Sequence, residues 1–193
     1  MLKEILLTET SILQYLYHLR SPLLNTIMIG ITHLGGVMMI IFGIIVVIFL
    51  LLKKYGSNAF LFTTIVGGSV LLDTILKNIF QRARPQYYPL VIEKDFSFPS
   101  GHAMNSLVFY LALSYLYFHI SKNKKRSFLM VFSSLILVLL VGISRVYLGV
   151  HYPSDIIGGY FFGALWLLCC YTIIHGRTIL PFLYKKRRRS YSR

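Results

Sequence analysis

Charged residues are scarce in this chain of 193 residues: they make up 13% of it, and only six residues are acidic. A soluble domain usually carries roughly 25% charged residues, so the composition argues against an ordinary soluble enzyme. Hydrophobic residues account for 56% of the chain, and the mean hydropathy is +0.67. Apolar runs long enough to cross a bilayer of roughly 30 Å recur along the sequence. A polytopic helical membrane protein is therefore predicted.

Cysteines are few, and clusters of metal ligands are lacking. The only two cysteines, Cys169 and Cys170, are adjacent within an apolar run, and neighbouring cysteines rarely bridge each other. No carboxylates are grouped with histidine or cysteine at the spacing of a metal site, so we expect neither a metal nor another cofactor. The first ten residues lack a basic start followed by a small-residue cleavage site. We expect membrane insertion to rely on the first spanning helix.

Five membrane-spanning helices can be read from the hydropathy pattern. Their expected ranges are 37–52, 59–80, 101–120, 128–143 and 154–174. The preceding region is weaker, because Ser21 and Pro22 interrupt it and polar residues are scattered through the rest. We interpret residues 5–34 as one or two interfacial helices, with a sixth span from this region as the alternative. The expected fold is an all-α transmembrane bundle of five or six spans.

This interpretation divides the chain into N-terminal interfacial helices over 1–36, a transmembrane bundle over 37–176 and a basic tail over 177–193. The net charge of +14 does not indicate a nucleic-acid partner, because the basic residues cluster at the ends of spans. The run from Lys185 to Arg189 is expected to contact anionic lipids instead. No pattern in the sequence fixes an oligomeric state.

The same distribution of basic residues predicts the orientation in the membrane. With a cytoplasmic tail and alternating spans, thirteen of the twenty Lys and Arg lie on the cytoplasmic side. They are Lys53, Lys54, Lys122, Lys124, Lys125, Arg126, Arg177, Lys185, Lys186, Arg187, Arg188, Arg189 and Arg193. This bias follows the positive-inside rule. We expect a multi-pass protein of the bacterial cytoplasmic (inner) membrane.

Three polar blocks stand at the ends of apolar runs, and this orientation places all of them on the extracytoplasmic face. They run from Lys77 to Pro85, from Pro99 to His102, and from Ser144 to Asp155. Lys77, Arg84 and Arg145 supply three cations, and the blocks add two imidazoles and a carboxylate around a glycine-containing turn. Such an inventory suits a dianionic phosphate and a histidine that attacks it.

Five residues of these blocks are suited to binding phosphate. Arg84 can present a planar fork to two phosphate oxygens, whereas Lys77 acts as a point charge. Ser100 and Gly101 open the third span, where Ser100 can cap the helix and the first amides can cradle an anion. Arg145 adds a further cation at the end of the fourth span.

Two histidines and a carboxylate are suited to the chemistry. Asp155 follows His151 by four residues and can hold one nitrogen of its ring, which leaves the other nitrogen free to attack phosphorus. His102, in the first turn of the third span, can protonate the departing group. The sequence thus predicts a nucleophile, its orienting carboxylate and an acid.

Other polar residues on this face match no such pattern. Asp73 is expected to pair with Lys77 or to be held neutral, and Arg82 is expected to contact lipid headgroups. Glu93 and Asp95 lie on the same face without an assigned role.

The three blocks resemble the signature motifs of the type 2 phosphatidic acid phosphatase superfamily, which are Lys-x6-Arg-Pro, Pro-Ser-Gly-His and Ser-Arg-x5-His-x3-Asp. Every specified position matches, and the resemblance covers about residues 60–165. It implies a metal-independent reaction through a phosphohistidine, with His151 as nucleophile, Asp155 as its orienter and His102 as acid. The phosphate-binding residues that it implies are Lys77, Arg84, Ser100, Gly101 and Arg145.

The resemblance implies a membrane lipid phosphate or diphosphate phosphatase that acts at the extracytoplasmic face. Undecaprenyl diphosphate is the expected substrate on family grounds. Phosphatidylglycerophosphate, phosphatidate and the 1-phosphate of lipid A are the alternatives. A lipid-to-lipid phosphotransferase and a silent lipid-binding relative are further hypotheses, and the intact catalytic residues argue against the silent relative.

Overall fold

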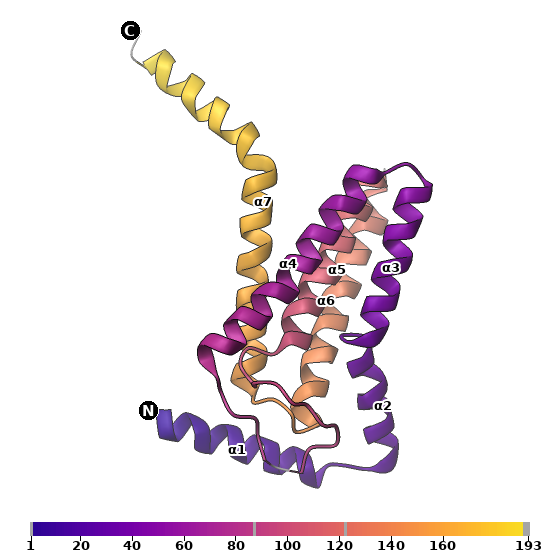
Figure 1. The fold of residues 1–193 in the computed structure, drawn as a ribbon, viewed down its shortest axis with the longest axis vertical. Coiled ribbons are helices and arrows are strands. Elements are labelled where there is room, and N and C mark those ends of the chain that lie inside the picture. The colour runs from indigo at the N-terminus through magenta and orange to yellow at the C-terminus, as the bar shows by residue number, and fades with distance from the viewer. Residues whose placement is uncertain (1, 87, 122, 191–193) are drawn as a thin grey trace.

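The computed structural model describes residues 2–86, 88–121 and 123–190; within these ranges, the side chains of 2, 3, 5, 6 and 176–190 are not described. The described ranges contain seven helices and no strand, which confirms the predicted all-α fold (Figure 1). The helices are α1 (Leu2–His18), α2 (Pro22–His33), α3 (Val37–Leu52), α4 (Gly56–Phe80), α5 (Gly101–Ile120), α6 (Lys124–Tyr147) and α7 (Pro153–Ser190).

Five stretches of these described helices are long and apolar enough to cross a membrane. They are Pro22–Leu52, Gly56–Phe80, Gly101–Ile120, Lys124–Tyr147 and Pro153–His175. The first is longer than predicted, because α2 and α3 are separated only by a turn at residues 34–36 and together form one candidate span. Alone, α2 is too short to cross a bilayer. It therefore extends the first span and does not form a sixth, and the predicted domain boundary at residue 36 falls at the turn.

Helix α5 lies at the centre of the bundle and packs against α4, α6 and α7. It is the most buried of the candidate spans, and Met104, Val108 and Phe109 along it are almost completely inaccessible. A Cβ atom on Gly159 would lie only 2.7 Å from the carbonyl oxygen of Ser100. This glycine therefore lets the starts of α5 and α7 approach closely, which brings two of the polar blocks together.

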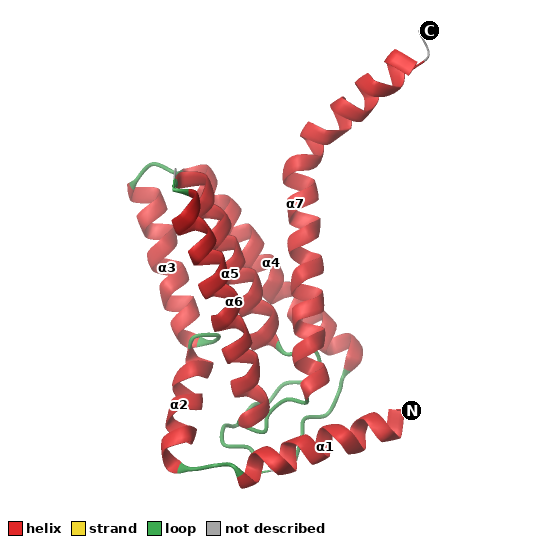
Figure 2. Cartoon of the chain, turned by 180° about the vertical axis from the view of Figure 1, so that it is seen from behind, coloured by secondary structure: helices red, strands yellow, loops and turns green. Residues whose placement is uncertain are grey.

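Helix α1 lies across the end of the bundle that carries the α4–α5 and α6–α7 loops (Figures 1 and 2). Its last turn leads to Arg20, whose Nη1 donates to the carbonyl oxygen of Tyr88 at 2.6 Å and whose Nη2 donates to that of Tyr147 at 2.9 Å. These bonds fasten the link between α1 and α2 to the α4–α5 loop and to the end of α6. Helix α1 is not among the candidate spans.

The other end of the molecule carries the C-terminal part of α7, which extends away from the bundle (Figure 1). The backbone of the predicted basic tail continues as helix to Ser190. The side chains of the tail lie outside the described part of the chain, so its contact with anionic lipids stays a prediction.

Candidate active site

The three polar blocks meet at the end of the bundle that α1 crosses. The helices bring them there in the following way: Lys77 lies near the end of α4, Arg84 in the loop after it, Ser100 to His102 at the start of α5, Arg145 near the end of α6, His151 in the α6–α7 loop, and Asp155 in the first turn of α7. All eight predicted site residues therefore belong to one region, although their sequence positions span 77 to 155.

The first block enters the site where α4 ends. The helix stops at Phe80, the predicted end of this span, because Gln81 adopts a left-handed backbone with a φ of 47°. The chain then turns back, and Arg84 donates from Nη1 to the carbonyl oxygen of Val150 at 2.8 Å. This bond holds the guanidinium next to His151. The side chains of Lys77 and Arg84 are 11% and 14% exposed.

His151 is almost completely buried, and its hydrogen bonds indicate which tautomer it adopts. Its Nε2 lies 3.1 Å from Nη1 of Arg84. Because a guanidinium can only donate, Nε2 accepts this bond and the ring proton lies on Nδ1. That nitrogen is 3.4 Å from Oδ2 of Asp155, which is too long for a strong hydrogen bond but orients the ring. The lone pair of Nε2 thus faces the cations.

The electrostatic surroundings favour the neutral form of this imidazole. Burial lowers the pKa of His151 to about 4; Asp155 opposes the shift, and Arg84 and Arg145 reinforce it. At neutral pH the ring is therefore uncharged. A neutral imidazole with a lone pair among cations can act as a nucleophile toward an anion that those cations bind.

Asp155 is fully buried and belongs to a larger polar network than the sequence indicated. Its Oδ1 accepts from Nη1 of Arg82 at 2.6 Å, and its Oδ2 accepts from the amide of Tyr152 at 2.8 Å and from Oγ of Ser97. Arg82 also donates from Nη2 to Oε2 of Glu9 in α1 at 2.8 Å. The expectation that Arg82 contacts lipid headgroups is therefore wrong. Its guanidinium holds the carboxylate of Asp155 in place beside His151.

The start of α5 differs in one detail from the expectation. Ser100 is the N-cap residue, but its hydroxyl does not bond to the helix amides and, among the described residues, has no hydrogen-bond partner although it is buried. A Cβ atom on Gly101 would lie 2.5 Å from Oδ2 of Asp73, so a larger residue here would push this carboxylate away. The same carboxylate oxygen is 3.5 Å from Nζ of Lys77, which confirms the predicted pairing of Asp73 with Lys77.

The N-terminal region forms one wall of the site, which the sequence did not indicate. Arg145, 1% exposed, donates from Nη1 to Oγ1 of Thr32 at 2.9 Å. A Cβ atom on Gly36 would lie 2.9 Å from Nε2 of His102, so the turn between α2 and α3 covers this ring closely. Glycine at this turn leaves room for the histidine.

Two acids of the α4–α5 loop contact the cations of the site. Asp95 forms ion pairs with Lys77 and Arg84, and Glu93 forms one with Arg145. Burial alone would raise the pKa of Asp95, but its hydrogen bonds and ion pairs with Lys77 and Arg84 lower it to about 2. Sequence reasoning assigned no role to either acid, because no local pattern relates them to the cations.

Within the described part of the chain, no group of three or more His, Cys, Asp or Glu is placed to hold a metal ion.

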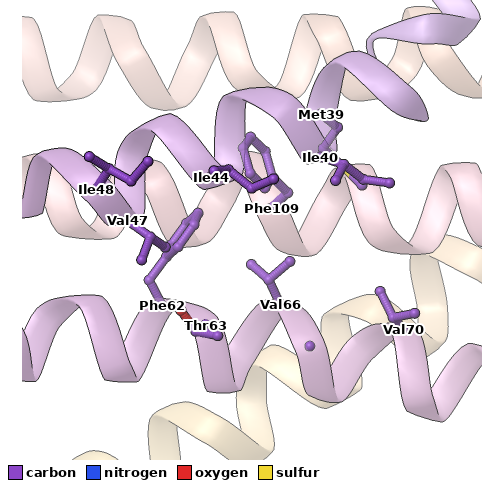
Figure 3. Close-up of a pocket in the computed structure, with 12 residues that line it drawn as sticks. Met39, Ile40, Ile44, Val47, Ile48, Phe62, Thr63, Val66, Val70 and Phe109 are labelled. Atoms are coloured by element: carbon purple, nitrogen blue, oxygen red, sulfur yellow. The ribbon is translucent and has the colours of Figure 1, made fainter.

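A separate apolar recess of about 390 Å³ lies between α3, α4 and α5 (Figure 3). Met39, the lining residue nearest in sequence to Gly36, lies about one helical turn beyond it. The recess is lined by Met39, Ile40, Gly43, Ile44, Val47, Ile48, Phe62, Thr63, Val66, Gly67, Val70 and Phe109.

Comparison with known proteins found related sequences over most of the chain. The model of the PAP2 superfamily matches residues 58–179. Phosphatidylglycerophosphatase B of Bacillus subtilis (strain 168) is 40% identical over 154 residues, which cover 76% of this chain and 73% of that protein. The lipid A 1-phosphatase of Rhizobium etli is 34% identical over 135 residues, which cover 65% of this chain and 53% of that protein.

Two crystal structures share the fold. The first transmembrane PAP2 type phosphatidylglycerolphosphate phosphatase from Bacillus subtilis superposes with a TM-score of 0.83 at 32% identity, over 90% of this chain and 87% of the other. Aquifex aeolicus LpxE superposes with a TM-score of 0.65 over 84% of this chain and 94% of its own. At 19% identity the second likeness concerns the fold alone.

Proposed function

The chain belongs to the PAP2 superfamily and is a multi-pass membrane lipid phosphatase, and we propose that its substrate is phosphatidylglycerophosphate. The observation that carries this proposal is the 40% identity to phosphatidylglycerophosphatase B over 73% of that protein. The similarity of the chain to the crystal structure of a phosphatidylglycerolphosphate phosphatase supports it further. Phosphatidylglycerophosphate is therefore better supported than undecaprenyl diphosphate, which we expected from the family motifs alone.

The 1-phosphate of lipid A is a second candidate substrate. Lipid A 1-phosphatases of two Rhizobium species are 34% identical to the chain. The matched regions cover only 53% and 50% of those proteins, so this candidate has weaker support.

The proposed reaction begins with attack on phosphorus by Nε2 of His151. Three cations, Lys77, Arg84 and Arg145, neutralise the phosphate and the charge that develops in the transition state. The hydroxyl of Ser100, which has no hydrogen-bond partner among the described residues, and the backbone at Gly101 supply further donors at the start of α5. The P–N bond forms as the P–O bond to the lipid breaks, which gives a phosphohistidine and a lipid alcohol.

His102 completes both halves of this proposed cycle. In the first half it gives a proton to the departing lipid oxygen, and in the second it takes a proton from the water that attacks the phosphohistidine. The products are the lipid alcohol and orthophosphate, and His151 returns to its neutral form. Asp155 keeps the proton of His151 on Nδ1 throughout.

The apolar recess supports a lipid substrate that enters sideways from the bilayer. Its lining residue Met39 lies about one helical turn from the glycine that covers His102, and its lining is almost wholly hydrophobic (Figure 3). An acyl chain there would place the attached phosphate near the histidines.

We propose the extracytoplasmic face of the bacterial cytoplasmic membrane as the location of the reaction, on the basis of the positive-inside bias.

Phosphate release from a panel of lipids tests the proposed substrate. Purified protein is incubated in matched detergent micelles with phosphatidylglycerophosphate, undecaprenyl diphosphate, phosphatidate and lipid A 1-phosphate, and kcat/KM is measured for each. The His151→Ala variant serves as the control for contaminating phosphatases. We expect the highest kcat/KM for phosphatidylglycerophosphate. A higher value for any other lipid of the panel would replace the proposed substrate with that lipid.

A further inference from the structure

The three cations proposed to bind phosphate are already paired with two carboxylates of the same chain. Asp95 contacts both Lys77 and Arg84, and Glu93 contacts Arg145. Together the two side chains carry two negative charges, as a dianionic phosphate does. They therefore match the substrate group in charge and in the partners that they use.

The exposed fractions of these side chains show from which side the carboxylates reach the cations. Asp95 is 49% exposed and Glu93 is 28% exposed, whereas Arg145 is only 2% exposed. The acids thus lie on the solvent side of cations that are nearly buried. A phosphate that takes over the contacts now made by the acids must displace them from the cations.

The backbone of the loop holds Asp95 in this position. Nε of Arg84 donates to the carbonyl oxygen of Asp95 at 2.8 Å, and the amide of Ser97 donates to that of Arg82 at 2.8 Å. These bonds do not involve the carboxylates. The side chains of Glu93 and Asp95 can therefore rotate away from the cations while the loop stays attached.

We propose that Glu93 and Asp95 form an internal anion, the carboxylate plug, which occupies the phosphate site of the resting enzyme and is displaced by the substrate phosphate. The proposal rests on the proposed phosphate-binding role of the three cations. A tethered competitor raises the apparent dissociation constant of every phosphate ligand by the same factor. A lipid substrate offsets this factor by its concentration in the membrane. Free orthophosphate does not, so the plug weakens inhibition by the product.

A purely structural role of the two acids predicts the opposite result. If the carboxylates only held the cations in place, removing their charge would disorder the site and weaken anion binding. If they compete with phosphate, removing their charge strengthens anion binding. The direction of the change therefore distinguishes the two roles.

Binding of orthophosphate and of vanadate to purified protein, measured by isothermal titration calorimetry without lipid substrate, tests the plug. We expect Asp95→Asn and Glu93→Gln each to tighten binding, and the double variant to tighten it about tenfold, or about 1.4 kcal/mol. Each single variant carries the test if the double variant does not fold. Unchanged or weaker binding in the folded variants would overturn the plug.

Lys94→Gln is the matched control, because Lys94 is exposed between the two acids and its removal changes the net charge by one unit as well. A general electrostatic effect of the loop would make this variant bind anions more weakly by a factor comparable to the gain in Asp95→Asn, which would count against the plug. We expect Lys94→Gln to change binding less than twofold. A comparable loss would mean that net charge and not occupancy sets the affinity.

The calorimetric test also separates the plug from the proposed function. Arg145→Ala should lose most of its affinity for vanadate; binding equal to that of the unaltered protein would contradict both the phosphate site and the plug. Tighter binding in the double variant together with poor hydrolysis of phosphatidylglycerophosphate would support the plug and refute only the proposed substrate. Tighter product inhibition by orthophosphate in the double variant would show that the plug acts during turnover.

Discussion

At the scale of single residues, the candidate site depends on how one imidazole is held. His151 accepts a hydrogen bond from Arg84 on one side and faces Asp155 on the other. Burial and the neighbouring cations destabilise the protonated ring more than Asp155 stabilises it. The ring therefore stays neutral. The arrangement favours nucleophilic attack over general acid catalysis at this position.

Replacing the proposed nucleophile should abolish turnover without unfolding the protein. We expect no phosphate release by His151→Ala above background, since no other described side chain takes its place. Asp155→Asn should reduce kcat by roughly 10²–10⁴, because it removes the group that fixes the tautomer. The measurement is initial-rate kinetics on protein that elutes as a single species in size-exclusion chromatography. Near-normal activity of His151→Ala would contradict the phosphohistidine mechanism.

The depressed pKa of His151 also predicts how stability depends on pH. The pKa is lower in the folded protein than in an unfolded chain, so protonation favours unfolding and stability falls as the pH drops below about 6.5. With a folded pKa of about 4, the loss between pH 7.5 and pH 5 is about 2 kcal/mol. The thermal unfolding midpoint in detergent should therefore fall less for His151→Gln than for the unaltered protein over this range. Equal falls would contradict a neutral buried His151.

At the scale of elements, α1 is linked to the chemistry through a chain of charged groups. Glu9 accepts from Arg82 and from the amide of Ser154 in the first turn of α7, each at 2.8 Å. The dipole of α7 stabilises a carboxylate at its N-terminus. Arg82, which Glu9 holds in position, donates in turn to Asp155. Helix α1 thus helps to position Asp155, the carboxylate proposed to orient His151.

A double-mutant cycle tests this link between α1 and the site. Glu9→Gln and Arg82→Gln should each lower kcat by about tenfold with a smaller change in KM, because Asp155 is less firmly held. The double variant should be no worse than Arg82→Gln alone, because both changes interrupt one path. Arg82→Lys should restore part of the activity. Multiplicative losses in the double variant would mean that Glu9 and Arg82 act independently.

The elements differ in how far their sequence could predict them. The motif-bearing ends of α4, α5 and α7 follow from local patterns, because helix-ending and helix-starting residues stand next to the polar blocks. The Glu9–Arg82 pair joins positions 73 residues apart, and Gly36 meets His102 only after the bundle has formed. Such contacts depend on tertiary packing, which no short pattern encodes. For the same reason the sequence predicts an interfacial helix at α2, because its continuation into α3 depends on a short turn.

At the scale of the whole molecule, we expect basic groups to supply the charge that a metal ion could otherwise provide. Lys77, Arg84 and Arg145 converge from three different segments on one site. Three fixed cations can stabilise the charge that develops on a transferring phosphoryl group. The bundle, by bringing together the ends of α4 and α6, assembles this charge.

Activity should therefore persist when divalent metal ions are removed. We expect the rate of lipid dephosphorylation in excess chelator to stay within about twofold of the untreated rate, because the cations neutralise the phosphate directly. The assay is phosphate release after dialysis against chelator, with a metal-dependent phosphatase treated in parallel as a positive control. Loss of activity that added Mg²⁺ restores would contradict the mechanism.

The orientation of the bundle decides which leaflet supplies the substrate. The loop between α4 and α5 carries part of the candidate site, and the short turn between α3 and α4 lies at the other end of the bundle (Figure 1). In a background without Cys169 and Cys170, a thiol is introduced at one position on each side: Ile92→Cys, at an exposed loop residue, or Ser57→Cys, at an exposed residue at the start of α4. Serine and cysteine have nearly the same shape, so Ser57→Cys leaves the turn undisturbed.

We expect an impermeant maleimide to label Ile92→Cys in intact cells and Ser57→Cys only after the cells are permeabilised. The physical reason is the excess of basic residues at the Ser57 end of the bundle, which the positive-inside rule retains in the cytoplasm. Labelling of both variants after permeabilisation serves as the control for thiol accessibility. The reverse pattern in intact cells would place the site on the cytoplasmic face, and the substrate would then have to come from the inner leaflet.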